Sequence, residues 1–230
     1  MMFRLVMCIW ILTLTSGPTA TFAEAAPRIL AIGDSLLAWH KQRGRSIADV
    51  VSTELKEPIR NRSVGGARLM YELPVTGAMG LNVSRQFKRG PWEWVLVSGG
   101  GNDLLFGCGC SRCDRQIERM VSGDGRRGVV PNLLYRIRKT GAKVIVIGYL
   151  RSPGVGSMID GCKQEGDTYE ARLAKTAQHM NGVFFVSNAD LVPHGDRSFH
   201  SGDMIHPSPK GSAAIGRRVA ALIRQVDQSR

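Results

Sequence analysis

The sequence lacks the short motifs of several large enzyme classes. It contains no G-x-S-x-G pentapeptide, which argues against a conventional α/β-hydrolase with a nucleophile elbow. It also has no G-x-x-x-x-G-K phosphate-binding loop and no H-E-x-x-H zinc motif. Internal repeats and low-complexity linkers are absent too, so a repeat array is excluded.

Hydrophobic runs long enough to span a bilayer are missing as well. The apolar stretch near the N-terminus, Leu5 to Leu12, is far shorter than the roughly 20 residues that a membrane-spanning helix needs. Arg4 precedes this stretch and the small-residue segment Ala23-Glu24-Ala25 follows it, which is typical of a secretory signal peptide. We therefore expect residues 1–25 to be a signal peptide and residues 26–230 to form one exported domain, periplasmic or secreted, with no integral membrane span.

Acidic residues are few compared with basic ones. The chain has 19 Asp and Glu against 31 Lys and Arg, which gives a formal net charge of +12. Nucleic acid is not the expected partner, because the chain is exported and shows no aromatic-basic pattern of a known binding module. An anionic polysaccharide, a phospholipid headgroup or simple solubility explains the charge equally well.

Cysteine is scarce, but its pattern is informative. Four of the five cysteines follow the signal peptide, namely Cys108, Cys110, Cys113 and Cys162. In an oxidising compartment an even number favours two disulfides, with three possible pairings that the sequence does not rank. A zinc site is the less favoured alternative, because no second Cys or His pair accompanies the cluster. We expect one bridge to tie Cys162 to the cluster.

Short β-rich runs alternate with longer segments of helical period. The runs are Arg28 to Ile32, Ile59 to Val64, Trp94 to Ser98, Lys143 to Tyr149 and Val183 to Ser187. Helical spacing recurs in three segments, around residues 47–55, 133–137 and 213–222. This alternation predicts an α/β fold with a parallel sheet and helices on both faces.

Glycine-bearing segments follow the first three predicted strands. They are Gly33-Asp34-Ser35, Val64-Gly65-Gly66 and the segment 99–103, GGGND. Because sites in open parallel sheets gather at the carboxyl ends of strands, we expect these segments to converge.

The converging segments contain the groups that acyl transfer by serine requires. Ser35, at a strand-to-helix junction, supplies the hydroxyl, with a backbone N–H that the helix leaves free. His206 and Asp203 supply the base and the carboxylate that orients it, three residues apart on one face of an expected helical turn. The Gly66 N–H and the Asn102 side-chain amide complete the set as oxyanion donors, together with the Ser35 N–H.

Four segments together resemble the conserved blocks of the SGNH hydrolase superfamily, also called the GDSL esterase/lipase family. They are GDSL at 33–36, SVGGAR at 63–68, GGGNDLL at 99–105 and DMIHP at 203–207, in the family's order. The resemblance implies Ser35 as nucleophile, His206 as base, Asp203 as third triad member, and Gly66 and Asn102 as oxyanion donors. It also implies a flavodoxin-like three-layer α/β/α sandwich with about five parallel strands, and no metal or organic cofactor.

The expected function is that of an exported serine esterase that hydrolyses carboxylic esters of short acyl groups such as acetyl. Its substrate is an ester, with an acylated glycan and a lipid as the alternatives. The same triad would serve a polysaccharide O-acetyltransferase or a lysophospholipase or lipase. A noncatalytic carbohydrate-binding module is a weaker alternative, because a binding protein has no need of Ser35, Asp203 and His206 together.

Overall fold

The computed structural model describes residues 26–229, so the expected signal peptide lies outside the described residues. Within them, five parallel strands form one sheet in the order β2-β1-β3-β4-β5. The strands are β1 Ile29–Ile32, β2 Ile59–Asn61, β3 Trp94–Val97, β4 Lys143–Ile147 and β5 Val183–Val186. Each predicted apolar run thus contains a strand, which confirms the parallel sheet.

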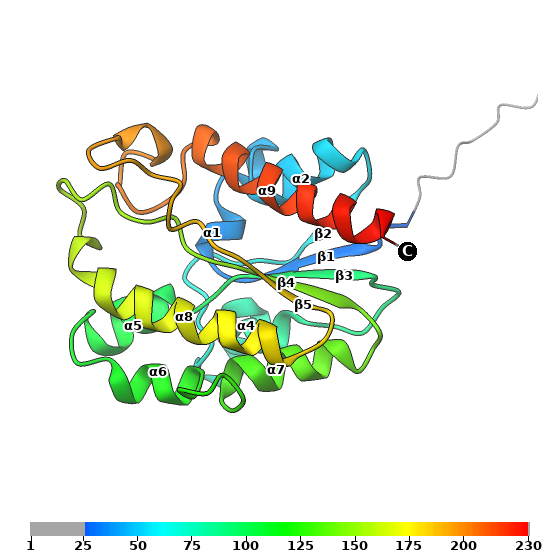
Figure 1. The fold of residues 1–230 in the computed structure, drawn as a ribbon, viewed down its shortest axis with the longest axis horizontal. Helices are drawn as coiled ribbons and strands as arrows, with labels where there is room; N and C mark the ends of the chain where they lie inside the picture. Colours follow the sequence, from blue (N-terminus) through cyan, green and yellow to red (C-terminus); the bar gives the residue numbers. More distant parts are fainter. Residues whose placement is uncertain (1–25, 230) are drawn as a thin grey trace, which may run out of the picture.

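Helices cover both faces of the sheet (Figure 1). They are α1 Ser35–Ala38, α2 Ile47–Leu55, α3 Pro74–Thr76, α4 Val83–Gln86, α5 Gly101–Cys108, α6 Asp114–Met120, α7 Val129–Arg138, α8 Lys163–His179 and α9 Pro209–Gln228. Helices α1, α2 and α9 lie on one face, and α4 to α8 lie on the other (Figure 1). The flavodoxin-like three-layer α/β/α sandwich is confirmed.

Alternate residues of each central strand enter two separate cores. In β1, Leu30 and Ile32 pack into the core beneath α5 to α8, whereas Ile29 and Ala31 pack into the core beneath α2 and α9. All four are fully buried. A strand that is buried on both faces has a continuous run of apolar residues. These strands could therefore be predicted from the sequence.

Helices α2 and α9 start at polar caps that the sequence supplies. Ser46 and Asp49 form a capping box at the start of α2. Ser208 caps α9, and Pro209 occupies its first turn, where a missing N–H costs nothing. These caps fix where each helix leaves the loop before it.

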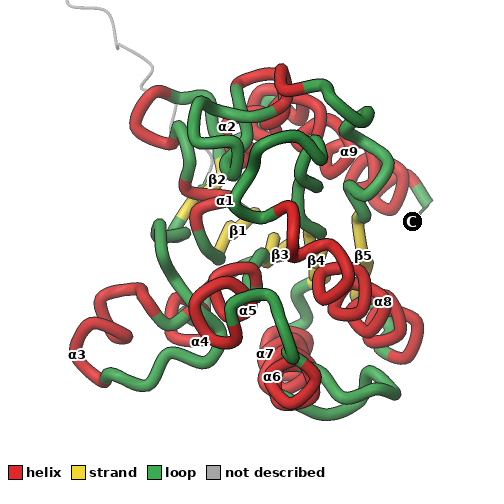
Figure 2. The backbone as a smooth tube through the Cα atoms, turned by 90° about the vertical axis from the view of Figure 1, so that its left-hand side faces the viewer, coloured by secondary structure: helices red, strands yellow, loops and turns green. Residues whose placement is uncertain are grey.

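The loops that follow β1, β2 and β3 meet at the carboxyl end of the sheet. Figure 2 looks along the strands, with α1 and α5 near the centre of the view. Because β1 lies between β2 and β3, a residue just after β1 lies between the loops that follow its two neighbours. No helix within residues 26–229 is both long enough and apolar enough to cross a bilayer.

Candidate active site

Ser35 is the first residue of α1, and buried hydrogen bonds hold the residues before it. Asp34 caps the helix by accepting from the Leu36 N–H at 3.1 Å. Its carboxylate also accepts from the Ser98 hydroxyl at 2.9 Å and from the Tyr149 hydroxyl at 2.8 Å. Burial raises the pKa of Asp34, against the opposing effect of these hydrogen bonds. Asp34 therefore positions Ser35 as a structural cap.

Gly33 allows the strand end to approach its neighbour closely. A Cβ at Gly33 would lie 2.7 Å from the Ser98 carbonyl oxygen, and its φ of +152° suits glycine. The buried Gln86 amide bonds both the Gly33 N–H, at 2.6 Å, and the Gly33 carbonyl, at 2.8 Å. Ser35 is therefore carried on a segment with little freedom to move.

The two oxyanion candidates beyond Ser35 belong to loops that are bonded to each other. The Asn102 amide donates to the Ala67 carbonyl at 3.0 Å, directly after Gly66. The carboxylate of Asp103, whose pKa burial raises, accepts from the N–H groups of Leu69 and Met70 at 2.9 Å each. One hydrogen of the Asn102 amide remains available for a substrate oxygen.

Gly66 adopts a left-handed conformation, with φ of +76°, in the loop after β2. Among the residues the structure describes, neither the Gly66 N–H nor the Ser35 N–H donates a hydrogen bond to the protein. An oxyanion hole requires unpaired donors of this kind.

Asp203 and His206 are in contact, but not through the helical turn expected from the sequence. The His206 Nδ1 lies 2.6 Å from Asp203 Oδ2, while Asp203 Oδ1 accepts the N–H groups of Ile205 and His206 at 3.0 Å each. Met204 is left-handed, with φ of +58°, so the segment is a turn closed by the aspartate itself. Burial alone would raise the pKa of Asp203, but its hydrogen bonds, led by that from His206, lower it overall.

Trp39 supports the imidazole, a role that was not predicted from the sequence. Its ring is stacked on His206 with centroids 3.8 Å apart and planes 8° apart. Its Nε1 donates to the Ser201 hydroxyl at 2.9 Å, in the same turn that carries His206. An aromatic residue four positions after Ser35 was the only signal, and in a short helix that position is usually explained by the core.

Ser35, Asn102 and His206 line one cavity of about 390 Å³. Asp203 contacts His206 but does not line the cavity, and neither does Gly66. Within the described residues, Ser35 and His206 are not hydrogen-bonded to each other. This is common before substrate binds, because catalytic hydrogen bonds are often long in the free enzyme. Seven large aliphatic side chains supply much of the apolar lining: Leu36, Leu104, Leu105, Leu150, Ile159, Val192 and Ile205. Charged or titratable residues also line the cavity: Asp34, Arg151, Asp160, Lys163, Asp167 and His194.

Two disulfides lie beside this cavity, Cys108–Cys113 and Cys110–Cys162. The second confirms the expected link between Cys162 and the cluster. Cys162 itself lines the cavity and ends the β4–α8 connection, residues 148–162, which forms one wall. Helix α5 also lines the cavity and ends two residues before Cys110, so the bridge joins two of the segments that line it.

The model of the GDSL-like lipase/acylhydrolase family matches residues 31–214. The chain belongs to this family. This GDSL-like hydrolase is accordingly a serine hydrolase that acts on esters.

Solved structures of low identity share the fold of this GDSL-like hydrolase. A psychrotrophic esterase from Pseudoalteromonas sp. is 16% identical, with 87% of this chain and 98% of that chain covered and a TM-score of 0.57. An aryl esterase of M. smegmatis is 17% identical, with 87% and 99% covered and a TM-score of 0.56. A family two carbohydrate esterase from Clostridium thermocellum is 18% identical, with 88% and 66% covered and a TM-score of 0.56. No curated protein matches the chain.

Proposed function

We propose that this chain is an exported serine esterase that forms an acyl-enzyme on Ser35. The observation that carries the proposal is that Ser35, His206 and Asn102 open onto one apolar cavity while Asp203 bonds the far nitrogen of His206. This arrangement leaves His206 Nε2 free to face the hydroxyl, as the base of a triad must.

In the proposed first step the Ser35 Oγ attacks the ester carbonyl carbon and its proton passes to His206 Nε2. Asp203 holds the opposite N–H and stabilises the charged imidazole. The carbonyl oxygen, now negative, accepts from the N–H groups of Ser35 and Gly66 and from the Asn102 amide. The carbon–oxygen bond to the alcohol then breaks, and the alcohol leaves with the proton from His206.

In the second step a water molecule attacks the acyl-enzyme. His206 takes a proton from the water, the same donors hold the oxyanion, and the Ser35 oxygen leaves with that proton. The products are the carboxylic acid and the free enzyme. The two steps together require the protein groups named above and one water molecule.

The cavity supports acyl groups longer than the acetyl group expected from the sequence. Its volume of about 390 Å³ and its aliphatic lining suit a hydrocarbon chain, because burying such a chain is favourable by about 0.8 kcal/mol per CH₂. We therefore propose esters of short to medium acyl chains as substrates.

Export is part of the proposal and rests on the pattern of residues 1–25 together with the cysteines. Four cysteines paired in two disulfides are characteristic of an oxidising compartment. Mass spectrometry of the protein released by cells would give the mature N-terminus, and a chain that retains residues 1–25 would contradict the proposed cleavage.

The test of the catalytic proposal is hydrolysis of p-nitrophenyl esters from acetate to palmitate, under non-reducing conditions. We expect turnover by the mature chain, with the best chain length between these extremes. Ser35→Ala and His206→Ala should each abolish turnover while their circular dichroism spectra stay native. A folded Ser35→Ala variant that retains wild-type activity would overturn the mechanism.

A further inference from the structure

A second hollow lies on the other side of Ser35 from the apolar cavity. This groove, of about 470 Å³, is formed by the α1–α2 connection and the loop after β2. The residues that matter here are Trp39, His40, Lys41, Arg43 and Gly65. Because β1 lies between β2 and β3, Ser35 is placed between this groove and the cavity formed by the loops after β3 and β4.

The groove is basic, and no carboxylate lines it. The Lys41 ammonium donates to the Ser63 carbonyl at 2.9 Å and keeps two further N–H donors. Arg43 forms no ion pair with any Asp or Glu among residues 26–229. Both side chains are therefore free to bind an anion.

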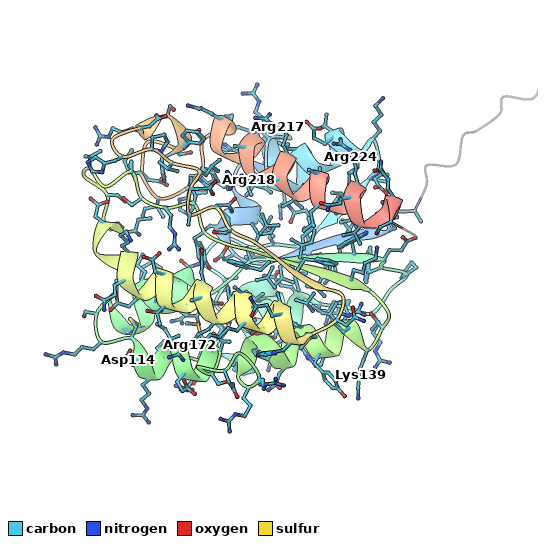
Figure 3. The ribbon with its side chains drawn as sticks, in the orientation of Figure 1. Asp114, Lys139, Arg172, Arg217, Arg218 and Arg224 are labelled. Carbon is cyan, nitrogen blue, oxygen red and sulfur yellow. A yellow bond between two sulfur atoms is a disulfide. The ribbon has the colours of Figure 1, made fainter. Side chains whose placement is uncertain are left out.

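Some cations on the helices are already engaged. Figure 3 labels Arg172, Arg218 and Arg224 on the two helical layers. Each has a carboxylate partner: Glu118 at 2.6 Å, Asp190 at 2.7 Å and Glu54 at 3.0 Å, respectively. Arg217 and Lys139, labelled in the same figure, form no ion pair with a carboxylate among residues 26–229, so neither net charge nor an unpaired cation alone selects a site. Lys41 and Arg43 differ from them because both line a groove next to the segment that carries Ser35.

Two contacts connect the groove to the proposed catalytic groups. Trp39, which lines the groove, is stacked on His206. Gly65, which also lines the groove, directly precedes Gly66. An ester bound with its acyl chain in the apolar cavity would therefore direct its alcohol half over the oxyanion loop toward the groove.

We propose that the groove binds a phosphate group on the alcohol half of the substrate, so that the enzyme acts on acyl esters of phosphorylated polyols. The assignment rests on the proposed function. A phosphate carries up to two negative charges and several acceptor oxygens, which match the two cations and their N–H donors. The apolar cavity selects the acyl half, and the basic groove selects the alcohol half.

The experiment compares two substrates that differ only in the phosphate: 1-hexanoylglycerol and 1-hexanoylglycerol 3-phosphate. We expect kcat/KM of the wild type to be about tenfold higher for the phosphorylated ester, from one well-placed charge-assisted contact. Arg43→Gln and Lys41→Gln should each remove most of this preference through a higher KM. Arg45→Gln is the matched control, because Arg45 is exposed nearby but does not line the groove.

Equal kcat/KM for the two esters in the wild type would overturn the proposed phosphate site but would not contradict the proposed esterase function. A preference that survives in both groove variants, or that Arg45→Gln removes equally, would overturn it as well. If neither ester is hydrolysed, the proposed function fails. Calorimetry with glycerol 3-phosphate then tests phosphate binding by the groove independently of catalysis. If Arg43→Gln weakens this binding, the result supports the proposed phosphate site. If there is no binding, or if Arg43→Gln leaves it unchanged, the proposed site is overturned.

A further arm distinguishes two sources of the phosphate. Micelles of 1-palmitoylglycerol 3-phosphate present it as a lipid headgroup, whereas the hexanoyl ester presents it as a soluble phosphorylated polyol. The comparison uses the phosphate preference, which is kcat/KM relative to the acylglycerol with the same acyl chain and no phosphate. A larger preference on the micelles assigns the groove to lipid headgroups, and a larger preference on the soluble ester assigns it to small phosphorylated polyols.

Discussion

Trp39 shows how a single side chain can set the geometry of a proposed base. The stack at 3.8 Å covers one face of the His206 ring, and the indole N–H holds the Ser201 hydroxyl of the same turn. Asp203 fixes the ring from its edge through Nδ1. With one face covered and one edge bonded, the imidazole has few orientations left.

Replacing Trp39 should therefore lower the rate of chemistry more than it lowers substrate binding. We expect Trp39→Ala to reduce kcat on a p-nitrophenyl ester by roughly tenfold to a hundredfold, since small misplacements of a catalytic group have effects of that size. Trp39→Phe, which keeps a stacking ring but loses the N–H, should fall between this variant and the wild type. Steady-state kinetics would check this, and an unchanged kcat in Trp39→Ala would show that the stack has no positioning role.

At the scale of elements, the disulfide between Cys110 and Cys162 joins α5 to the β4–α8 connection. It closes a separation of 52 residues, whereas Cys108–Cys113 closes a separation of only 5. A hydrogen bond from the Ser157 hydroxyl to the Met204 carbonyl, at 2.8 Å, ties the same connection to the turn that carries His206. The β4–α8 connection is thus attached to its neighbours at two points, Ser157 and Cys162.

Removing the longer bridge should destabilise the protein and loosen the cavity. The chain-entropy model gives about 4 kcal/mol for the Cys110–Cys162 loop and about 2 kcal/mol for the Cys108–Cys113 loop. We expect Cys110→Ala/Cys162→Ala to show the larger fall in free energy of unfolding and a KM that rises more for octanoate than for acetate esters. Cys108→Ala/Cys113→Ala is the control. Identical dependence of KM on acyl-chain length in both double variants would show that the Cys110–Cys162 disulfide has no role in substrate selection.

The strands were predictable because their residues are buried on both faces and form continuous apolar runs. The positions of Ser35 and Asn102 followed, since each lies in the short segment that comes after such a run. The turn at Met204 was not predictable in the same way, because a left-handed methionine has no sequence signature and the spacing of Asp203 and His206 also fits a helix. The basic groove depends on three-dimensional proximity of the α1–α2 connection and the loop after β2, which no local pattern contains.

At the scale of the whole molecule, an ion cluster lies at the end of the sheet opposite the site. Asp227, in the last turn of α9, bonds Lys143 at 2.8 Å and Arg28 at 3.0 Å, and accepts from the Trp94 indole N–H at 3.2 Å. Arg28 precedes β1, while Trp94 and Lys143 begin β3 and β4. The cluster therefore ties α9 to the amino ends of three central strands, and the candidate active site lies at their carboxyl ends.

This separation predicts that Asp227→Asn will lower stability without changing catalysis. Removing the charge leaves Lys143, whose side chain is only 9% exposed, without its anionic partner, and we expect a loss of about 1–2 kcal/mol after screening by solvent. Chemical denaturation would measure the loss. Asp190→Asn, which breaks an exposed pair with Arg218, is the control and should have a smaller effect. In both variants kcat/KM should stay at the wild-type value wherever the protein is folded.

The loss of stability in Asp227→Asn should depend on pH in a direction set by the pKa of Asp227. Burial would raise the pKa of Asp227, but hydrogen bonds from Lys143, Arg28 and Trp94 hold it below its usual value of 3.8. A carboxyl with a lowered folded-state pKa contributes its full stability above its unfolded value and loses it as the pH falls through the folded value. The difference between wild type and Asp227→Asn should thus be constant from neutral pH to about 5 and shrink below about 4. A difference that grows on acidification would mean that Asp227 is destabilising when ionised, contrary to the contacts of its carboxylate.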